Sequence, residues 1–330
     1  FKIDIIIVTK EGITHKQQSG KIVEEFYTEM DKLTSSVAKG FPKWIDSSSS
    51  TIYSALIKPI KTELEDKKRI CIIPEGNLNY IPFQALKNED TNKYLIEDYA
   101  IYYTPSLSTL LWLRSFGTYG GRELFALGDP VFEEIAEVEM AMRSNLTPLP
   151  ASRDEVLALE EIYYPHAEVL LSEETSESNF KNNASDYGII HIASHALIEE
   201  NSPMYSSIAF SNEENEDGFL EAREIINLEL NADLIVLSAC KTASGHIMEG
   251  EGMMGLTRAF FTAGVPSVVA SLWNVADNST RDLMVEFHTY LREGERPAIA
   301  LQKAQIHMLT KSSNKDPIFW APFILIGDSE

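Results

Sequence analysis

The sequence predicts an α/β fold in which helices cover both faces of a mainly parallel sheet. Short apolar runs rich in β-branched and aromatic residues recur along the chain, and segments with helical periodicity separate most of them. The runs are apolar at successive positions, which is typical of strands buried on both faces. Alternation of such strands with helices favours an α/β sandwich. The chain has 330 residues, enough for one large domain or two of medium size.

The strands are expected where these runs lie. In chain order they are IDIIIV (3–8), RICIIP (69–74), YAIYYT (99–104), LFALGD (124–129), IIHIAS (189–194), DLIVLSA (233–239) and SVVASLW (267–273). The aromatic-rich FWAPFILIGD (319–328) predicts a last strand that covers the core. By contrast, the polar run IDSSSS (45–50) predicts a mobile loop.

Helices are predicted between and after the later strands. EGMMGLTRAFFTAG (251–264) has an amphipathic pattern and ends at a glycine, which is typical of a helix C-terminus. NSTRDLMVEFHTYLREG (278–294) and RPAIALQKAQIHMLTK (296–311) follow, and Pro297 lies in the first turn of the second. Prolines without strand character predict a linker over 131–152, between a module at 1–130 and another at 153–330. The alternative is a single large sheet with N-terminal extensions.

Composition limits the classes of partner. Acidic residues outnumber basic ones 50 to 28, a net charge of −22. Such a surface repels nucleic acid and anionic membranes and attracts basic substrates or partners. The sequence has no signal peptide and no apolar run near the roughly 18 residues that cross a bilayer. Two cysteines cannot form a disulfide framework, which favours a reducing cytoplasm. The first residue is Phe1, so we expect a piece of a longer chain.

Two predicted strands end in reactive side chains. His195 follows IIHIAS, and Cys240 follows DLIVLSA. Because ligands of open α/β sheets bind beyond the carboxyl ends of strands, the two residues are candidates for one site. A histidine beside a thiol takes its proton and raises the nucleophilic thiolate fraction. On this pattern alone, a buried structural cysteine and a surface histidine stay open as the alternative.

A second histidine, His191, lies in the same run. In a strand, residues four apart point the same way but lie roughly 13 Å apart, at about 3.3 Å per residue. One metal ion cannot bind both rings, so we expect no zinc site and interpret His191 as a hydrogen-bonded core residue. Cys71, inside RICIIP, is interpreted as a small buried hydrophobe.

The run GEGMMG (250–255) fits the G-x-G-x-x-G pattern of dinucleotide sites. That pattern requires its first glycine directly after a strand, whereas this strand ends about ten residues earlier, near Cys240. Glu249 and Glu251 would also repel a pyrophosphate. We therefore expect no nucleotide cofactor, and interpret these glycines as a mobile loop that leads into a helix.

Spaced blocks of the sequence resemble the CHAT domain family, caspase-like cysteine peptidases of clan CD that are related to separases. The blocks are IYSALIKPI, IPEGNLNYIPFQAL, YTPSLSTL, LPASRDEV, HIASHA, ADLIVLSACKTASG, GEGMMGLTRAFFTAGVPSVVASLWNVADNSTRDLM and FWAPFILIGD. The resemblance runs from about residue 50 to the end. It implies a caspase-like α/β/α sandwich with a His195–Cys240 dyad, preceded by a non-catalytic, pseudo-caspase-like α/β module. It also implies an oxyanion hole made by the backbone N–H groups of Cys240 and Ala196. The family usually has glycine where this chain has Ala196, which puts the oxyanion geometry in question.

The resemblance also implies a specificity pocket. SLWNVADNST (271–280) is similar to the segment whose final aspartate faces a basic substrate side chain, and that position is Asp277 here. Trp273 and Ser238 are further candidates for its wall. The alternative is that Asp277 only starts the next helix. Ser279 and Asp282 form a capping-box pattern, which would leave Asp277 available for the pocket.

The function implied is a cytoplasmic cysteine endopeptidase that cleaves a protein substrate after a basic residue, without metal or cofactor. Family resemblance further implies control by an N-terminal tetratricopeptide repeat (TPR) region and by an activating protein or ribonucleoprotein partner. It also suggests prokaryotic defence, linked to CRISPR or gasdermin pathways. The competing interpretation is a catalytically silent, caspase-like adaptor that binds partner proteins without turnover.

Overall fold

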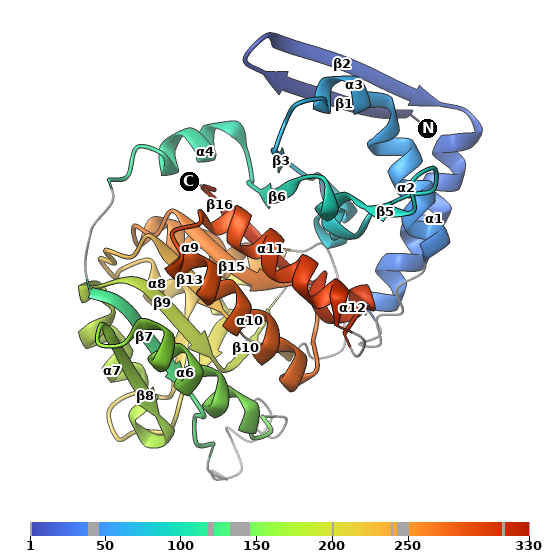
Figure 1. Ribbon diagram of the computed structural model, residues 1–330. Coiled ribbons are helices and arrows are strands. Elements are labelled where there is room, and N and C mark those ends of the chain that lie inside the picture. Colours follow the sequence, from blue (N-terminus) through green and yellow to red (C-terminus); the bar gives the residue numbers. More distant parts are fainter. Residues whose placement is uncertain are drawn as a thin grey trace.

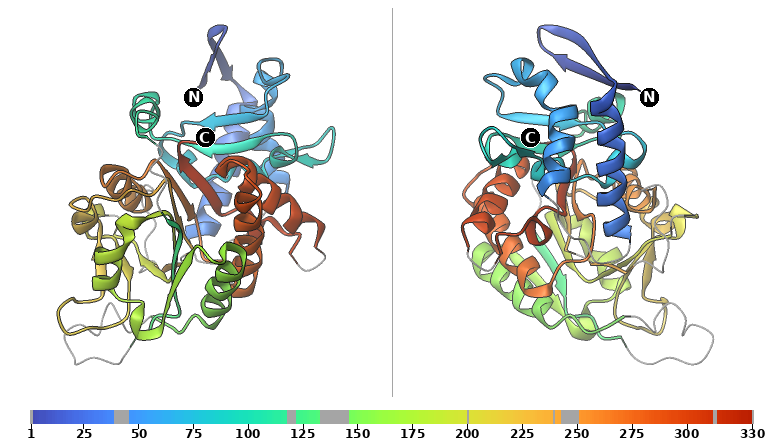
Figure 2. Two further views of the ribbon diagram at one scale, coloured as in Figure 1. Left: turned by 60° about the vertical axis from the view of Figure 1, so that its left-hand side comes forward. Right: turned by 90° about the vertical axis from the view of Figure 1, so that its right-hand side faces the viewer.

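The structure is a computed structural model, and it describes residues 2–38, 46–117, 122–132, 146–199, 201–238, 240–242, 251–311 and 314–329. Its core is one eight-stranded sheet with the order β3-β6-β16-β15-β13-β9-β7-β8. Helices lie on both faces of this sheet, so the predicted α/β/α sandwich is confirmed (Figures 1 and 2).

The strands are short, and most belong to the central sheet. Their bounds are β1 (Lys2–Thr9), β2 (Gly12–Ser19), β3 (Arg69–Ile72), β4 (Lys87–Asn88), β5 (Lys93–Tyr94), β6 (Ala100–Tyr103), β7 (Arg122–Gly128), β8 (Ala167–Leu171), β9 (Tyr187–Ala193), β10 (His195–Leu197), β11 (Ser207–Ala209), β12 (Phe219–Glu221), β13 (Leu234–Leu237), β14 (Cys240–Thr242), β15 (Ser267–Ser271) and β16 (Phe323–Gly327).

The α-helices vary from four to eighteen residues. Their bounds are α1 (Lys21–Ala38), α2 (Asp46–Leu56), α3 (Lys61–Leu64), α4 (Leu107–Leu113), α6 (Pro150–Tyr163), α7 (Glu177–Asn183), α8 (Ala222–Ile225), α9 (Glu251–Thr262), α10 (Asp277–Arg292), α11 (Pro297–Thr310) and α12 (Pro317–Trp320). Helices α6, α10 and α11 lie side by side over one face of the sheet, and α9 lies on the other (Figures 1 and 2).

Burial on both faces explains why the central strands read as continuous apolar runs. Every residue of β6, β13, β15 and β16 is buried. The paired strands of the central sheet run parallel, with the exception of β16, which is antiparallel to β15. The predicted helix ends are confirmed too: Gly264, with φ +108°, follows α9, and Pro297 opens α11.

A second, smaller sheet continues from two of the central strands. Its order is β12-β11-β10-β14. Strand β10 follows β9 after one intervening residue, and β14 comes shortly after β13, which pairs with β9 in parallel. The small sheet therefore extends the middle of the large one beyond its carboxyl edge.

The interpretation of IDIIIV as a buried strand of the parallel sheet is wrong. It forms β1, which pairs with β2 in an antiparallel hairpin separate from the central sheet. Only alternate residues face the body: Ile3 is buried, whereas Ile6 is 70 % exposed, as is Ile13 of β2 at 75 %. A strand with one solvent-exposed face normally alternates apolar and polar residues. In β1 the exposed face also carries apolar residues, so this alternation cannot be seen in the sequence.

The prediction of a loop over IDSSSS is also wrong, because residues 46–50 form the beginning of α2. Ser48, Ser49 and Ser50 are buried. The hydroxyl of Ser48 donates to Glu29 Oε2 at 2.6 Å, and that of Ser49 to the carbonyl of Ala85 at 2.7 Å. Buried hydroxyls are tolerated when they are hydrogen-bonded, and these partners lie far away in the sequence.

The central sheet is continuous across the predicted division at 131–152. Strands β6 and β7, from the first predicted module, pair with β16 and β9 of the second, and β3 pairs with β6. In particular, β7 lies between β9 and β8, both of which follow the predicted linker. The division thus does not coincide with a break in the sheet, and two separate folding units stay a prediction.

We expect Gly327→Ala to destabilise the fold by roughly 2–4 kcal/mol, through strain and overpacking. Gly327 has φ +108°, and a Cβ there would lie 2.1 Å from the carbonyl oxygen of Pro266 and about 3 Å from the Phe261 ring. The control Gly117→Ala adds a Cβ with no heavy atom within 4 Å. Urea unfolding of both variants tests this; equal midpoints would show that the backbone at β16 adapts without cost.

Candidate active site

Backbone register brings His195 and Cys240 together. The ladder between β10 and β14 is parallel and pairs His195 with Cys240, Ala196 with Lys241, and Leu197 with Thr242. Neighbouring strands lie about 4.8 Å apart, so the two backbone positions are adjacent despite their distance in sequence. The side chain of Cys240 lies outside the described residues, so the register concerns the main chain.

The ring of His195 is buried, at 3 % exposure, and its orientation is fixed by a backbone carbonyl. Nε2 lies 2.7 Å from the carbonyl oxygen of Thr147. Because a carbonyl oxygen only accepts, Nε2 must carry the proton in this bond, and Nδ1 is then the nitrogen able to accept one. The Phe132 ring packs against the imidazole, with centroids 5.5 Å apart.

Neither Phe132 nor Thr147 was expected at the site, since both lie in the predicted linker. They flank residues 133–145, which lie outside the described part of the chain. The segment 131–152 therefore supplies contacts to His195 and, from Pro150 onward, the first turn of α6. Its prolines were a signal of irregular backbone, and nothing in the residue types pointed to a carbonyl that orients a histidine.

Ala196, the predicted oxyanion donor, is a buried residue of β10. It pairs with Ile208 of β11 on one side and with Lys241 of β14 on the other. Its φ is not positive; the described non-glycine residues with positive φ are Asp66, Asn92, Asp129 and Ser172. Alanine in place of the family's glycine therefore costs no backbone strain here, and the oxyanion role stays a prediction.

Two predicted pocket residues are buried and lie near strand ends. Ser238 directly follows β13 and is 6 % exposed; its hydroxyl has no hydrogen-bond partner in the part of the chain that the structure describes. Trp273 is 3 % exposed, and its indole N–H donates to the carbonyl of Ile318 at 3.1 Å. Ser238 thus keeps hydrogen-bonding capacity that no described residue uses, whereas the indole N–H of Trp273 is occupied.

Asp277 is the first residue of α10, and its side chain lies outside the described residues. The N-cap is Ala276, without a side-chain cap. The predicted capping box at Ser279 is therefore wrong, because the helix begins two residues earlier. Asp282 instead accepts from Arg281 Nη2 at 2.9 Å. Asp277 therefore lies at the start of the next helix, as the alternative interpretation of this residue expects. Its role in a specificity pocket stays a prediction.

The sequence profile of the CHAT domain matches residues 46–328. The chain belongs to the CHAT domain family. Tetratricopeptide repeat protein 28 of Mus musculus and of Homo sapiens are each 23 % identical to it over 324 residues, an alignment that covers 84 % of this chain. The same alignment covers only 13 % of each relative.

Solved structures similar to this CHAT domain are caspase-like cysteine proteases. The Arg-specific cysteine proteinase gingipain R superposes with a TM-score of 0.53 at 10 % identity, covering 93 % of this chain and 75 % of that one. Saccharomyces cerevisiae separase, in its complex with securin, gives 0.50 at 12 % identity, covering 93 % and 22 %. At such identities the likeness shows the fold alone.

In the CHAT domain, His191 behaves as predicted for a core residue, whereas Cys71 is less buried than predicted. His191 is fully buried and bonded to Glu155 and His288, which confirms its interpretation. Cys71 is partly buried in β3, and burial raises the pKa of its thiol to about 11. Residues 243–250, which include the first glycine of GEGMMG, lie outside the described residues. The mobile-loop interpretation is wrong for its other two glycines, Gly252 and Gly255, because they lie in α9.

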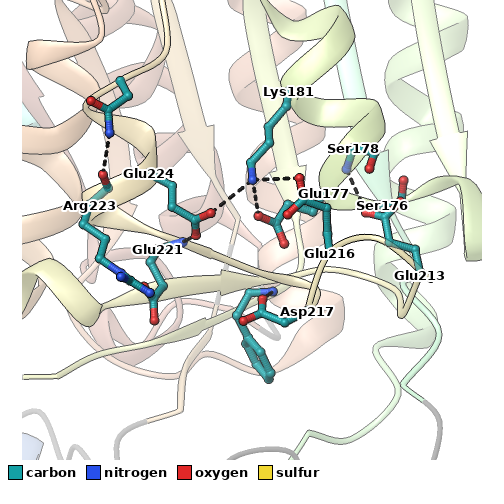
Figure 3. A network of polar contacts seen from close by, with 12 residues as sticks. Ser176, Glu177, Ser178, Lys181, Glu213, Glu216, Asp217, Glu221, Arg223 and Glu224 are labelled. Carbon is teal, nitrogen blue, oxygen red and sulfur yellow. Dashed lines mark hydrogen bonds and ion pairs between the residues drawn. The ribbon is translucent and has the colours of Figure 1, made fainter.

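An acidic cluster elsewhere in the CHAT domain already contains its own cation. Carboxylate oxygens of Glu177, Glu216 and Glu224 lie within 4.8 Å of one another. Nζ of Lys181 contacts all three, at 2.7, 3.0 and 3.1 Å (Figure 3). The ammonium group sits where a metal ion would have to bind, so the cluster is a clamp that joins α7, the segment before β12, and α8.

Among the described helices, none is both long and apolar enough to span a bilayer.

We expect Lys181→Met to destabilise the protein by roughly 2–4 kcal/mol at pH 8, because it leaves buried Glu177 without its counter-ion. Burial raises the pKa of Glu177 from its usual 4.5 to about 7. Below this pKa Glu177 is neutral and needs no counter-ion, so the loss should shrink as pH falls from 8 through 7 toward 5.

Chemical unfolding at pH 8 and pH 5 tests the clamp. Lys58→Met is the matched control, because Lys58 and Asp90 form an exposed ion pair, 60 % and 68 % accessible. We expect that control to change stability by less than about 1 kcal/mol at either pH. A Lys181→Met loss that does not depend on pH would contradict this account.

Proposed function

We propose that this CHAT domain is a cysteine endopeptidase in which His195 and Cys240 act as a dyad. The observation that carries the proposal is the parallel register of β10 and β14, which pairs the two positions directly. Two further contacts support it: the Nε2–H of His195 is held by Thr147, and its ring is packed by Phe132. A surface histidine with no role would have neither constraint.

In this mechanism, Nδ1 of His195 takes the thiol proton of Cys240, and the thiolate attacks the scissile carbonyl carbon. The bond from Nε2–H to the Thr147 carbonyl keeps the ring in the tautomer that leaves Nδ1 basic, and it stabilises the imidazolium. Backbone N–H groups of Cys240 and Ala196 would hold the oxyanion. The imidazolium then protonates the leaving amine, and water hydrolyses the thioester.

The substrate class we propose is a protein cleaved after a basic residue. Asp277 is at the N-terminal end of α10, which follows β15, the strand next to β13 in the sheet. Ser238, whose buried hydroxyl has no hydrogen-bond partner among the described residues, follows β13 itself. The net charge of −22 favours approach of basic segments. Gingipain R, a structural relative, is named as Arg-specific, which is consistent with this proposal.

Regulation by a repeat region is part of the proposal. The relatives are named as tetratricopeptide repeat proteins and are far longer than the part that aligns with this chain. A repeat region joined to this domain, together with an activating protein or ribonucleoprotein partner, would control cleavage at Cys240. The cytoplasmic location that we propose rests on the cysteine content, and the proposed part in prokaryotic defence rests on the family resemblance.

We expect Cys240→Ala and His195→Ala each to lower peptide cleavage by about 10³-fold or more without unfolding the protein, because the dyad works as a unit. Cys71→Ser should keep cleavage within about twofold, since a thiol with a raised pKa is not nucleophilic at neutral pH. Single-turnover assays with a repeat-containing full-length protein measure this. Turnover retained by Cys240→Ala would exclude the mechanism.

A peptidyl probe with a thiol-reactive group separates the enzyme from the adaptor. An enzyme is labelled at Cys240 and turns over matched peptides. A silent adaptor binds partners and shows neither reaction, even when the repeat region and the partner are present.

We expect Asp277→Asn to lower the preference for Lys or Arg before the scissile bond by at least about 30-fold, because losing a desolvated charge partner costs roughly 2–5 kcal/mol. Cleavage of matched peptides that differ only at that residue gives the ratio. Asp282→Asn is a useful control, because Asp282 is bonded to Arg281 on the same helix. An unchanged basic preference in Asp277→Asn would show that Asp277 does not contact the substrate.

A further inference from the structure

A chain of four buried polar side chains crosses the core between α6, β9 and α10. The Tyr163 hydroxyl lies 3.1 Å from Nδ1 of His288, whose Nε2 lies 3.0 Å from Nδ1 of His191. Nε2 of His191 lies 2.8 Å from Oε1 of Glu155. None of the four is more than 2 % exposed. Helices α6 and α10, which supply three of them, lie side by side over the sheet (Figure 1).

The donors and acceptors of this chain match in one direction. An ionised Glu155 accepts from Nε2–H of His191, which leaves Nδ1 of that ring to accept from Nε2–H of His288. Nδ1 of His288 then accepts from the Tyr163 hydroxyl. Both imidazoles are neutral in this arrangement, in agreement with their burial, which lowers the pKa of each. If every hydrogen bond ran in the opposite direction, Nδ1–H of His288 would donate to the Tyr163 oxygen. The hydroxyl hydrogen of Tyr163 would then have no acceptor within this network.

Each element that the chain joins leads directly to the candidate active site. Helix α6 begins at Pro150, three residues after Thr147, whose carbonyl accepts from His195. Strand β9 ends at Ala193, two residues before His195. Helix α10 begins at Asp277. The hydrogen-bonded chain therefore fixes the relative positions of the three segments that carry or orient the site.

We propose that Tyr163, His288, His191 and Glu155 form a positioning network that sets the His195 ring against Cys240, an inference that rests on the proposed dyad. We assign the four a positioning role and not a catalytic one, because none of the three hydrogen bonds that join them involves His195 or Cys240. Apolar packing alone tolerates small slips of a helix on a sheet. If α6 or α10 slipped along the sheet, polar groups of this network would be buried without hydrogen-bond partners, at a cost of about 1–3 kcal/mol each. The observed alignment of these helices on the sheet is therefore strongly preferred.

Tyr163→Phe and Glu155→Leu break the two ends of the network, and Glu155→Gln preserves an acceptor for His191. We expect the first two to lower kcat by about 10- to 100-fold with KM within about twofold, as a misplaced catalytic group does. Glu155→Gln should restore most of the rate. The matched control is Tyr103→Phe, which removes an equally buried hydroxyl that donates to Gln84, in a strand without site residues.

A second readout does not depend on peptide cleavage. In a Cys71→Ser background, the rate of Cys240 alkylation by iodoacetamide against pH reports thiolate formation next to His195. We expect Tyr163→Phe and Glu155→Leu to move its midpoint upward by about half a pH unit or more, which corresponds to a weakened Cys–His interaction. Nitrogen-15 shifts of the His195 ring should show partial loss of the Nε2–H tautomer in the same variants.

The outcomes separate this network from the peptidase proposal. If the parent protein cleaves nothing but the alkylation midpoint and ring shifts move in the variants, the peptidase proposal fails and the positioning network stands. If Tyr163→Phe lowers the melting temperature as Tyr103→Phe does, yet leaves kcat, alkylation and ring shifts at parental values, the network is only structural. That result would overturn the inference.

Discussion

The parallel pairing of two neighbouring strands is the constraint on which the candidate site depends. Strands β9 and β13 pair in parallel from Ile189 to Ile192, and the short ladder between β10 and β14 continues beyond their carboxyl ends. Because a parallel ladder fixes which residues lie opposite each other, His195 and Cys240 become neighbours without any direct sequence relation. Every other contact of the site, from the Thr147 carbonyl to the Phe132 ring, adjusts a histidine whose place this register has already determined.

The central sheet was predictable from sequence because burial on both faces leaves an unbroken apolar run. The same logic misread β1, where apolar residues at Ile6 and Val8 occupy the exposed face of a hairpin. It also misread the serines of α2. Their hydroxyls are satisfied by Glu29 and by the Ala85 carbonyl, partners that only the tertiary fold brings near. A local sequence pattern indicates only whether a residue type is commonly buried. Whether a particular polar side chain is buried depends on hydrogen-bond partners that can be distant in the sequence.

For the site, sequence identified the residues whose type carries chemistry and missed those that act through the backbone or through packing. His195 and Cys240 were proposed from their residue types at the ends of predicted strands together with the resemblance to the CHAT family, and their role as a dyad stays a proposal. Thr147 acts through its carbonyl, which any residue possesses, so no residue type could have indicated it. His191 was correctly predicted to be hydrogen-bonded, but its partners Glu155 and His288 come from two helices whose packing the sequence does not reveal.

Two buried polar systems hold the strand that carries His195 from both of its ends. The chain from Tyr163 to Glu155 locks β9, which precedes β10, to the helices over the sheet. Beyond β10, Lys181 gathers carboxylates of α7, α8 and the segment before β12, and so fixes the β11–β12 part of the small sheet. Buried charges add little net stability over apolar packing, but they penalise any shifted arrangement heavily. For the proposed dyad, in which His195 faces the thiol of Cys240, a penalty against the wrong alignment matters more than added stability.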